Sequence, residues 1–119
     1  MKVSAAVFLN WPRDRDSVGQ DWKLWCEKGY LDFVCPMDYT PHNSAFEGIV
    51  SQQVQWAGKV PCYPGIGLSC WTPPDDLVSL IEKIQITRRL KTGGFTIFDY
   101  SPAATRKVVE LCGRGITRK

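Results

Sequence analysis

The stretch LDFVCPMDY, residues 31–39, decides the fold expected of this chain. It begins as a run of apolar and β-branched residues and ends in polar ones, the pattern of a buried strand that leads into a loop. Three further stretches repeat the pattern at intervals of roughly 30 residues, the length of a strand plus a crossover helix: KVSAAVFL (2–9), VPCYPGIG (60–67) and GFTIFDY (94–100). Because strands and helices alternate, the sequence predicts a parallel sheet.

The segments between these strands carry helix signals. Capping-box spacing occurs at Ser17 with Gln20 and at Ser44 with Glu47. A capping residue precedes proline at Thr72–Pro73 and at Ser101–Pro102, and such a proline wastes no N–H in the first helical turn. Three apolar stripes at helical spacing are interpreted as core faces: Trp22, Trp25 and Cys26; Phe46, Ile49, Val50 and Val54; and Leu77, Leu80, Ile81 and Ile84.

Four consecutive βα units in a chain of 119 residues predict an α/β fold, half of a (β/α)8 barrel of the TIM type, as a single domain over residues 1–119. A complete barrel needs about 250 residues. Three arrangements would cover the open sheet: a missing N-terminal half of a longer protein, a second copy that makes a homodimer, or a small doubly wound domain. Since four units fit half of eight and no fifth strand is visible, the half-barrel is favoured.

The composition is that of an ordinary globular domain, with 44% hydrophobic and 23% charged residues and no apolar run near membrane-spanning length. No signal peptide is recognisable at the N-terminus, and the compartment is left open. The net charge of +3 is modest, and the basic residues near the C-terminus are interpreted as a solvated helix and tail. We therefore expect no nucleic-acid partner and no membrane partner.

The cysteines and the histidine predict no metal site and no cofactor. The five cysteines contain no C-x-x-C pair, and the chain has a single histidine, His42. Cysteines within apolar strands and helix faces are most often small buried hydrophobic residues.

Candidate functional residues gather where the predicted strands end. In a parallel α/β barrel the loops after the strands converge at one face, where ligands bind. Carboxylates, an amide, phenols and indoles meet there, and this mixture suits a sugar, whose C–H face packs on aromatic rings while its hydroxyls bind Asp or Asn. The residues in these positions are Asn10, Trp11, Asp38, Tyr39, His42, Trp71, Asp99 and Tyr100.

Several segments in order resemble one known family. QDWKLWCEKGYLDFVCPMDYTPHNSAF (20–46), VQWAGKVPCYPGIGLSCW (54–71) and GGFTIFDYS (93–101) are similar to the C-terminal half of a bacterial glycoside-hydrolase-like barrel family related to glycoside hydrolase family 10. The motifs are D-W-x-x-W, D-F-V-x-P-M-x-Y-T, Y-P-G-I-G and G-F-x-x-F-x-Y, and the similarity covers nearly the whole chain, roughly the last four strands of a barrel. The M-x-Y element also resembles a strand of chitinase-type barrels, where the tyrosine touches the substrate.

The resemblance implies hydrolysis of a glycosidic bond by two carboxyl groups. The similarity covers roughly the last four strands of the barrel, so the fourth strand of the barrel, where the general acid commonly lies, is outside it. In addition, VPCYPGIGLSCW has no Glu where a retaining nucleophile would stand. A complete catalytic pair is therefore not expected. Asp38 and Asp99 are the catalytic candidates, and the substrate-binding candidates are Asn10, Trp11, Tyr39, His42, Trp71 and Tyr100.

Other interpretations remain open. Asp38 and Asp99 can equally cap the turn that follows each strand, and Tyr39 and Tyr100 can be packing residues. The chain can be a non-catalytic carbohydrate-binding or structural half-barrel that dimerises. A phosphate-binding barrel fragment is a further alternative, because Gly65-Ile66-Gly67 allows close approach of an anion, although the basic residues Arg88, Arg89 and Lys91 are expected at the opposite face.

Overall fold

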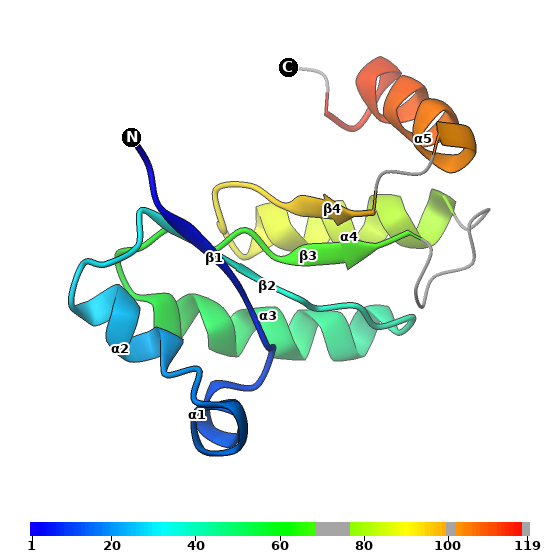
Figure 1. Cartoon of the computed structure of the whole chain (residues 1–119). Helices are drawn as coiled ribbons and strands as arrows, with labels where there is room; N and C mark the ends of the chain where they lie inside the picture. The colour runs from blue at the N-terminus through cyan, green and yellow to red at the C-terminus, as the bar shows by residue number, and fades with distance from the viewer. Residues whose placement is uncertain (69–76, 100–101, 118–119) are drawn as a thin grey trace.

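A computed structural model describes residues 1–68, 77–99 and 102–117. Helices and strands alternate along the chain, and each strand lies inside one of the stretches predicted from the sequence (Figure 1). The strands are shorter than predicted, with three or four residues each. The elements are β1 (Ser4–Val7), α1 (Trp11–Val18), α2 (Trp22–Glu27), β2 (Phe33–Pro36), α3 (Asn43–Ala57), β3 (Gly65–Gly67), α4 (Leu77–Arg89), β4 (Thr96–Phe98) and α5 (Pro102–Arg114).

The predicted half of a TIM-type barrel is wrong. The described strands form two separate parallel sheets of two strands each, β1 with β2 and β3 with β4, instead of one curved sheet. Val7 of β1 stands opposite Pro36 of β2, and Gly67 of β3 stands opposite Phe98 of β4. Between the two sheets the only ladder contact in the described residues is an isolated parallel bridge, Val34 to Cys62.

The break between the sheets has a cause in the sequence. At the bridge, the N–H of Val34 donates to Pro61 O at 3.0 Å, and the N–H of Tyr63 donates to Val34 O at 2.8 Å. The next bond of a parallel ladder would come from the N–H of residue 36. That residue is Pro36, which has no N–H, so the ladder stops after one bridge.

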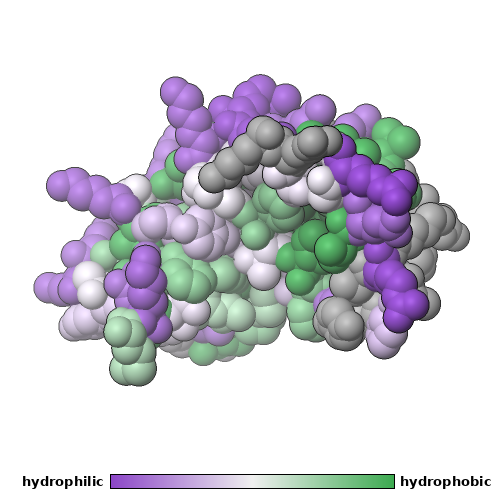
Figure 2. Space-filling view, turned by 90° about the horizontal axis from the view of Figure 1, so that it is seen from above, coloured by the Kyte–Doolittle hydropathy of each residue, from purple (hydrophilic) through white to green (hydrophobic). Residues whose placement is uncertain are grey.

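The strands have one covered side and one open side. Val7, Val34 and Ile66 are fully buried on the covered side, where α3 and α4 lie along the strands (Figure 1). Alternate residues point the other way, and among them Phe8 and Phe98 are each 45% exposed. Figure 2 looks down on the strands from the side away from α3 and shows apolar residues gathered along the middle, between hydrophilic ends. We call this surface the open face: Ala6, Phe8, Phe33, Cys35, Met37, Tyr39, Tyr63, Gly65, Gly67, Thr96 and Phe98.

The covered side holds two apolar clusters, one beneath each sheet. The first surrounds Val7, Trp22 and Val34, and the second surrounds Ile66, Leu80 and Ile84. Helix α3 contributes to both, with Phe46 and Val50 in the second cluster and Ala57 in the first. Within the described residues no helix combines the length and apolarity needed to cross a membrane.

Candidate functional site

Tyr39 lies flat against the two glycines of β3. A methyl group added to Gly65 would stand 2.8 Å from Pro36 O and 3.0 Å from Tyr39 Cε1, and one added to Gly67 would stand 3.3 Å from Tyr39 Cβ. A larger side chain would therefore collide with the strand at position 65 and would crowd the ring at position 67. The G-x-G pattern thus makes a seat for Tyr39, whose ring lies against β3 at these two glycines.

Tyr39 and Phe98 form an aromatic pair at the ends of β2 and β4. Their ring centroids are 5.2 Å apart with planes at 19°, a stacked arrangement. Phe98 is half-exposed, and Asp99 follows it directly with a half-buried side chain. A partly solvated aromatic pair, with a carboxylic acid residue next in the chain, therefore lies at the strand ends, where the sequence predicted ligand binding. We call Tyr39, Phe98 and Asp99 the strand-end site.

Asp38 points away from this site, into the helix layer. Its side chain is fully buried, and Oδ1 accepts a hydrogen bond of 2.6 Å from Gln53 Nε2 of α3, which also donates to Leu9 O at 3.0 Å. Burial raises the pKa of the Asp38 carboxyl to about 7, while the bond from Gln53 acts in the opposite direction. Asp38 lies two residues beyond β2 and is buried on the covered side, whereas the ring of Tyr39 lies against the glycines of β3.

Within the described residues, the two buried side-chain oxygens without a hydrogen-bond partner belong to this same pair, Asp38 Oδ2 and Gln53 Oε1. Both are acceptors while Asp38 is ionised, and a proton on Asp38 turns one of them into a donor. The unfilled acceptors and the raised pKa therefore agree that Asp38 is largely protonated up to about neutral pH. A neutral buried acid supports the strand end beneath Tyr39 and does not face the open side.

Asn10 and Trp11 serve the start of α1. Asn10 Oδ1 accepts the N–H of Arg13 at 3.3 Å, so the amide caps the helix. The indole of Trp11 donates to Asp21 Oδ1 at 2.7 Å and packs on Trp56 of α3 with centroids 5.8 Å apart. The structure therefore places both residues among the helices and does not bring them into the strand-end site.

His42 is the N-cap residue of α3 and is exposed, with no capping hydrogen bond from its side chain. The remaining predicted site residues, Trp71 and Tyr100, lie outside the described residues. Of the predicted set, Tyr39 lies at the strand ends stacked on Phe98, a residue that was not predicted, and Asp99 follows Phe98 in the chain.

Two functional features escaped the sequence interpretation. Phe98 was predicted as part of a strand and not as a site residue, although its parity with Thr96 on β4 places it on the side opposite Ile97. Gln53 breaks the predicted apolar stripe of α3, and the buried residues of that helix are Phe46, Val50, Gln53 and Ala57. A polar residue at a buried helix position is the signal that pointed to a buried polar partner.

Other chemistry is sparse in the part of the chain that the structure describes. It contains no group of three or more His, Cys, Asp or Glu side chains placed to hold a metal ion. Comparison with protein-family models, with curated protein sequences and with solved structures finds no match. The resemblance to the family-10-related barrel therefore stays a prediction from the sequence.

Proposed function

We propose that this chain binds carbohydrate at the strand-end site. The observation that supports the proposal is the stacked pair Tyr39–Phe98, held on the glycine seat of β3 and followed by Asp99. Aromatic rings of this kind pack against the C–H face of a sugar, and a neighbouring carboxylate accepts hydrogen bonds from its hydroxyls. Because the seat fixes the tyrosine ring before any ligand arrives, binding costs little ordering entropy.

The proposal assigns binding to the described residues and no bond cleavage. Glycoside hydrolysis needs two carboxyl groups that flank the same glycosidic bond. Asp38 is fully buried against α3, on the far side of the strand from Tyr39, so it does not flank a ligand on the open face. In this proposal Asp38 is a positioning residue that holds the strand end beneath the aromatic pair.

The experiment is a titration of the 15N-labelled chain with cello-, xylo- and chito-oligosaccharides, followed by amide chemical shifts. We expect at least one series to give saturable shifts around Tyr39 and Phe98. Phe98→Ala should weaken binding by about fivefold, since an aromatic contact contributes about 1 kcal/mol beyond its buried area.

Phe8→Ala is the matched control, because Phe8 lies on the same open face and is also 45% exposed. It should change the affinity by less than about twofold, while both variants keep the dispersed amide spectrum of a folded chain. The proposal fails if none of the three series saturates, or if the two variants weaken binding equally.

A further inference from the structure

A cavity lies at the end of the strands that is opposite to the strand-end site. It has a volume of about 670 Å³ and is enclosed by the end of α4, the turn before β4 and the chain after α5. This volume is in the range of pockets that take small organic molecules. The residues on which the argument rests are Arg88, Lys91, Thr92, Gly93, Phe95 and Thr117.

The charge of this cavity is positive and uncompensated. Arg88 and Lys91 line it, and among the described residues neither takes part in an ion pair. The neighbouring Arg89 is different, because its guanidinium bonds Glu47 Oε1 at 2.6 Å. No acidic side chain is found among the described residues that line the cavity.

The C-terminal end of α4 is not expected to repel an anion in this cavity. The C-terminus of a helix ordinarily presents free carbonyl oxygens, which repel negative charge. In this helix Ile86 O, Thr87 O and Arg88 O accept the N–H groups of residues 90, 92 and 91 at 3.0, 3.1 and 3.1 Å. These three carbonyls in the last turn of α4 are therefore satisfied by the chain itself.

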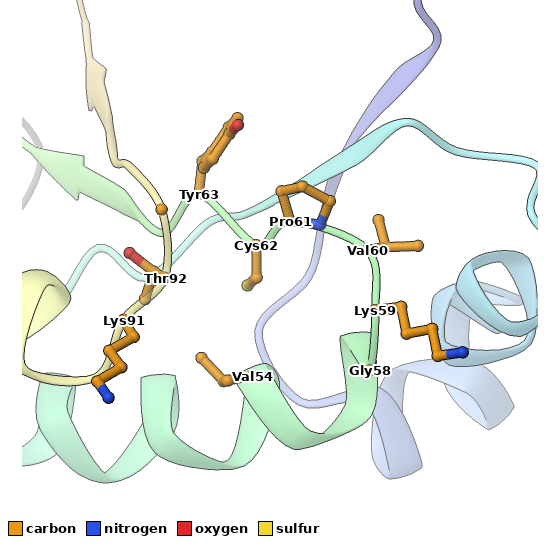
Figure 3. Close-up of a pocket in the computed structure, with 10 residues that line it drawn as sticks. Val54, Gly58, Lys59, Val60, Pro61, Cys62, Tyr63, Lys91 and Thr92 are labelled. Atoms are coloured by element: carbon orange, nitrogen blue, oxygen red, sulfur yellow. The ribbon is translucent and has the colours of Figure 1, made fainter.

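Lys91 stands at a backbone position that favours glycine. Its φ is 56°, the left-handed region, where residues with a Cβ are strained. Lys91 also lines a smaller adjoining cavity of about 310 Å³. Figure 3 shows Lys91 and Lys59 extending to opposite sides of that smaller cavity, so Lys59 is not part of the cationic group. Lys91 therefore lines both cavities, and among the described residues its ammonium group takes part in no ion pair.

We propose that the cavity at the end of α4 binds the oxyanion group of a small organic molecule, a phosphate or a carboxylate, through Arg88 and Lys91. A guanidinium binds two oxygens of such a group at once, and an ammonium adds a point charge. The half-buried Phe95 gives an apolar wall for the organic part of the ligand. This site is separate from the strand-end site and does not depend on the proposed carbohydrate binding.

The test follows amide shifts of the full chain with inorganic phosphate, sulfate and citrate, each at constant ionic strength set with sodium chloride. We expect saturable shifts at residues 91–95 with at least one anion at millimolar concentration. Saturation by phosphate identifies a phosphorylated ligand, and saturation by citrate alone identifies a carboxylated one.

Arg88→Gln should weaken binding at least about tenfold, because it removes charge-assisted hydrogen bonds. Arg89→Gln removes the same charge one residue away, outside the cavity, and should change the affinity by less than about twofold. Lys91→Gly should also weaken binding while it relieves the strained backbone position. Equal losses in Arg88→Gln and Arg89→Gln, or no saturable binding of any of the three anions, would overturn the proposal.

Discussion

Tyr39 and the glycines beneath it form a close contact that a single added methyl group would disturb. A Cβ added at residue 65 would meet the backbone oxygen of Pro36, which cannot move aside as a flexible side chain would. We expect Gly65→Ala to lower the free energy of unfolding by about 1–3 kcal/mol, the usual cost of overpacking. Urea denaturation of the purified variant measures this.

Gly48→Ala is the matched control for that substitution. Gly48 lies within α3, and a methyl group there would meet nothing within 4 Å. Since alanine is the better helix former, the control should gain about 0.5–1 kcal/mol. A loss in both variants would show that the seat beneath Tyr39 is not the cause.

Asp38 predicts a pH dependence of stability. Its pKa is about 7 in the folded chain, against 3.8 for the free side chain. The unfolded chain therefore loses its proton first as the pH rises, so the contribution of Asp38 is full below about pH 4 and is lost between about pH 4 and 7. Asp38→Asn should be more stable than the parent chain at pH 8, and the difference should shrink at pH 4.

Chemical denaturation at the two pH values measures this difference. Asp16→Asn is the control, because Asp16 is exposed and its hydrogen bond with Arg15 lowers its pKa, which gives a small effect of the opposite sign. A stability change in Asp38→Asn that is the same at both pH values would mean that Asp38 is already ionised in the folded chain.

At the level of single residues, the sequence located each strand within a predicted stretch, but it gave neither the end of most strands nor the direction of each side chain. Val34, Pro36 and Asp38 share one parity and are all buried, so Asp38 belongs to the covered side. The sequence interpretation placed Asp38 toward a ligand because it lies at a strand end, and it did not take this parity into account.

Among the elements, α3 begins earlier than its sequence signal. The predicted capping box at Ser44 and Glu47 is replaced by a start at Asn43, with His42 as the N-cap residue and no side-chain bond at the cap. We expect His42→Asp to stabilise the chain by about 1 kcal/mol, because a carboxylate accepts the free N–H groups of the first turn and suits the helix dipole.

Thermal unfolding at pH 7 tests this cap, with His42→Ala as the control. Alanine should leave the midpoint nearly unchanged, since the histidine side chain makes no capping bond to lose. A marked loss in His42→Ala would show that His42 supports the loop in another way.

The helices and strands themselves were largely predictable, and their assembly was not. Each described strand falls within a predicted stretch, and the stripe of Trp22 and Cys26 is buried as expected. The prediction of one sheet failed because strand propensity does not register that Pro36 lacks the N–H that would join β2 to the next stretch. In α4, Lys83 and Ser79 are buried through hydrogen bonds with Asn43, which an apolar pattern cannot anticipate.

For the whole molecule, two sheets over two apolar clusters predict two units of local stability joined by α3. Val7→Ala should speed hydrogen exchange mainly in β1 and β2, and Ile66→Val mainly in β3 and β4, because each removes buried methyl groups from one cluster. Amides of α3 should exchange slowest in the parent chain. Equal acceleration throughout the chain in either variant would mean that the two clusters unfold as one.

The homodimer predicted from the sequence stays a prediction, and it concerns the open face of the whole molecule. Parallel sheets are ordinarily covered on both faces, and here the described residues cover one. Light scattering coupled to size exclusion gives the solution mass that decides it, and a monomer at all concentrations would contradict the prediction.

The seat beneath Tyr39 also has a consequence for how sequences related to this one can vary. The ring of Tyr39 fills the space above Gly65 and Gly67, so positions 39, 65 and 67 constrain one another. If a related or designed sequence has a small residue in place of the tyrosine, position 67 can accept a larger side chain. Position 65 stays limited by the backbone oxygen of Pro36. Covariation of 39 with 67, but not with 65, is the record that such a contact would leave.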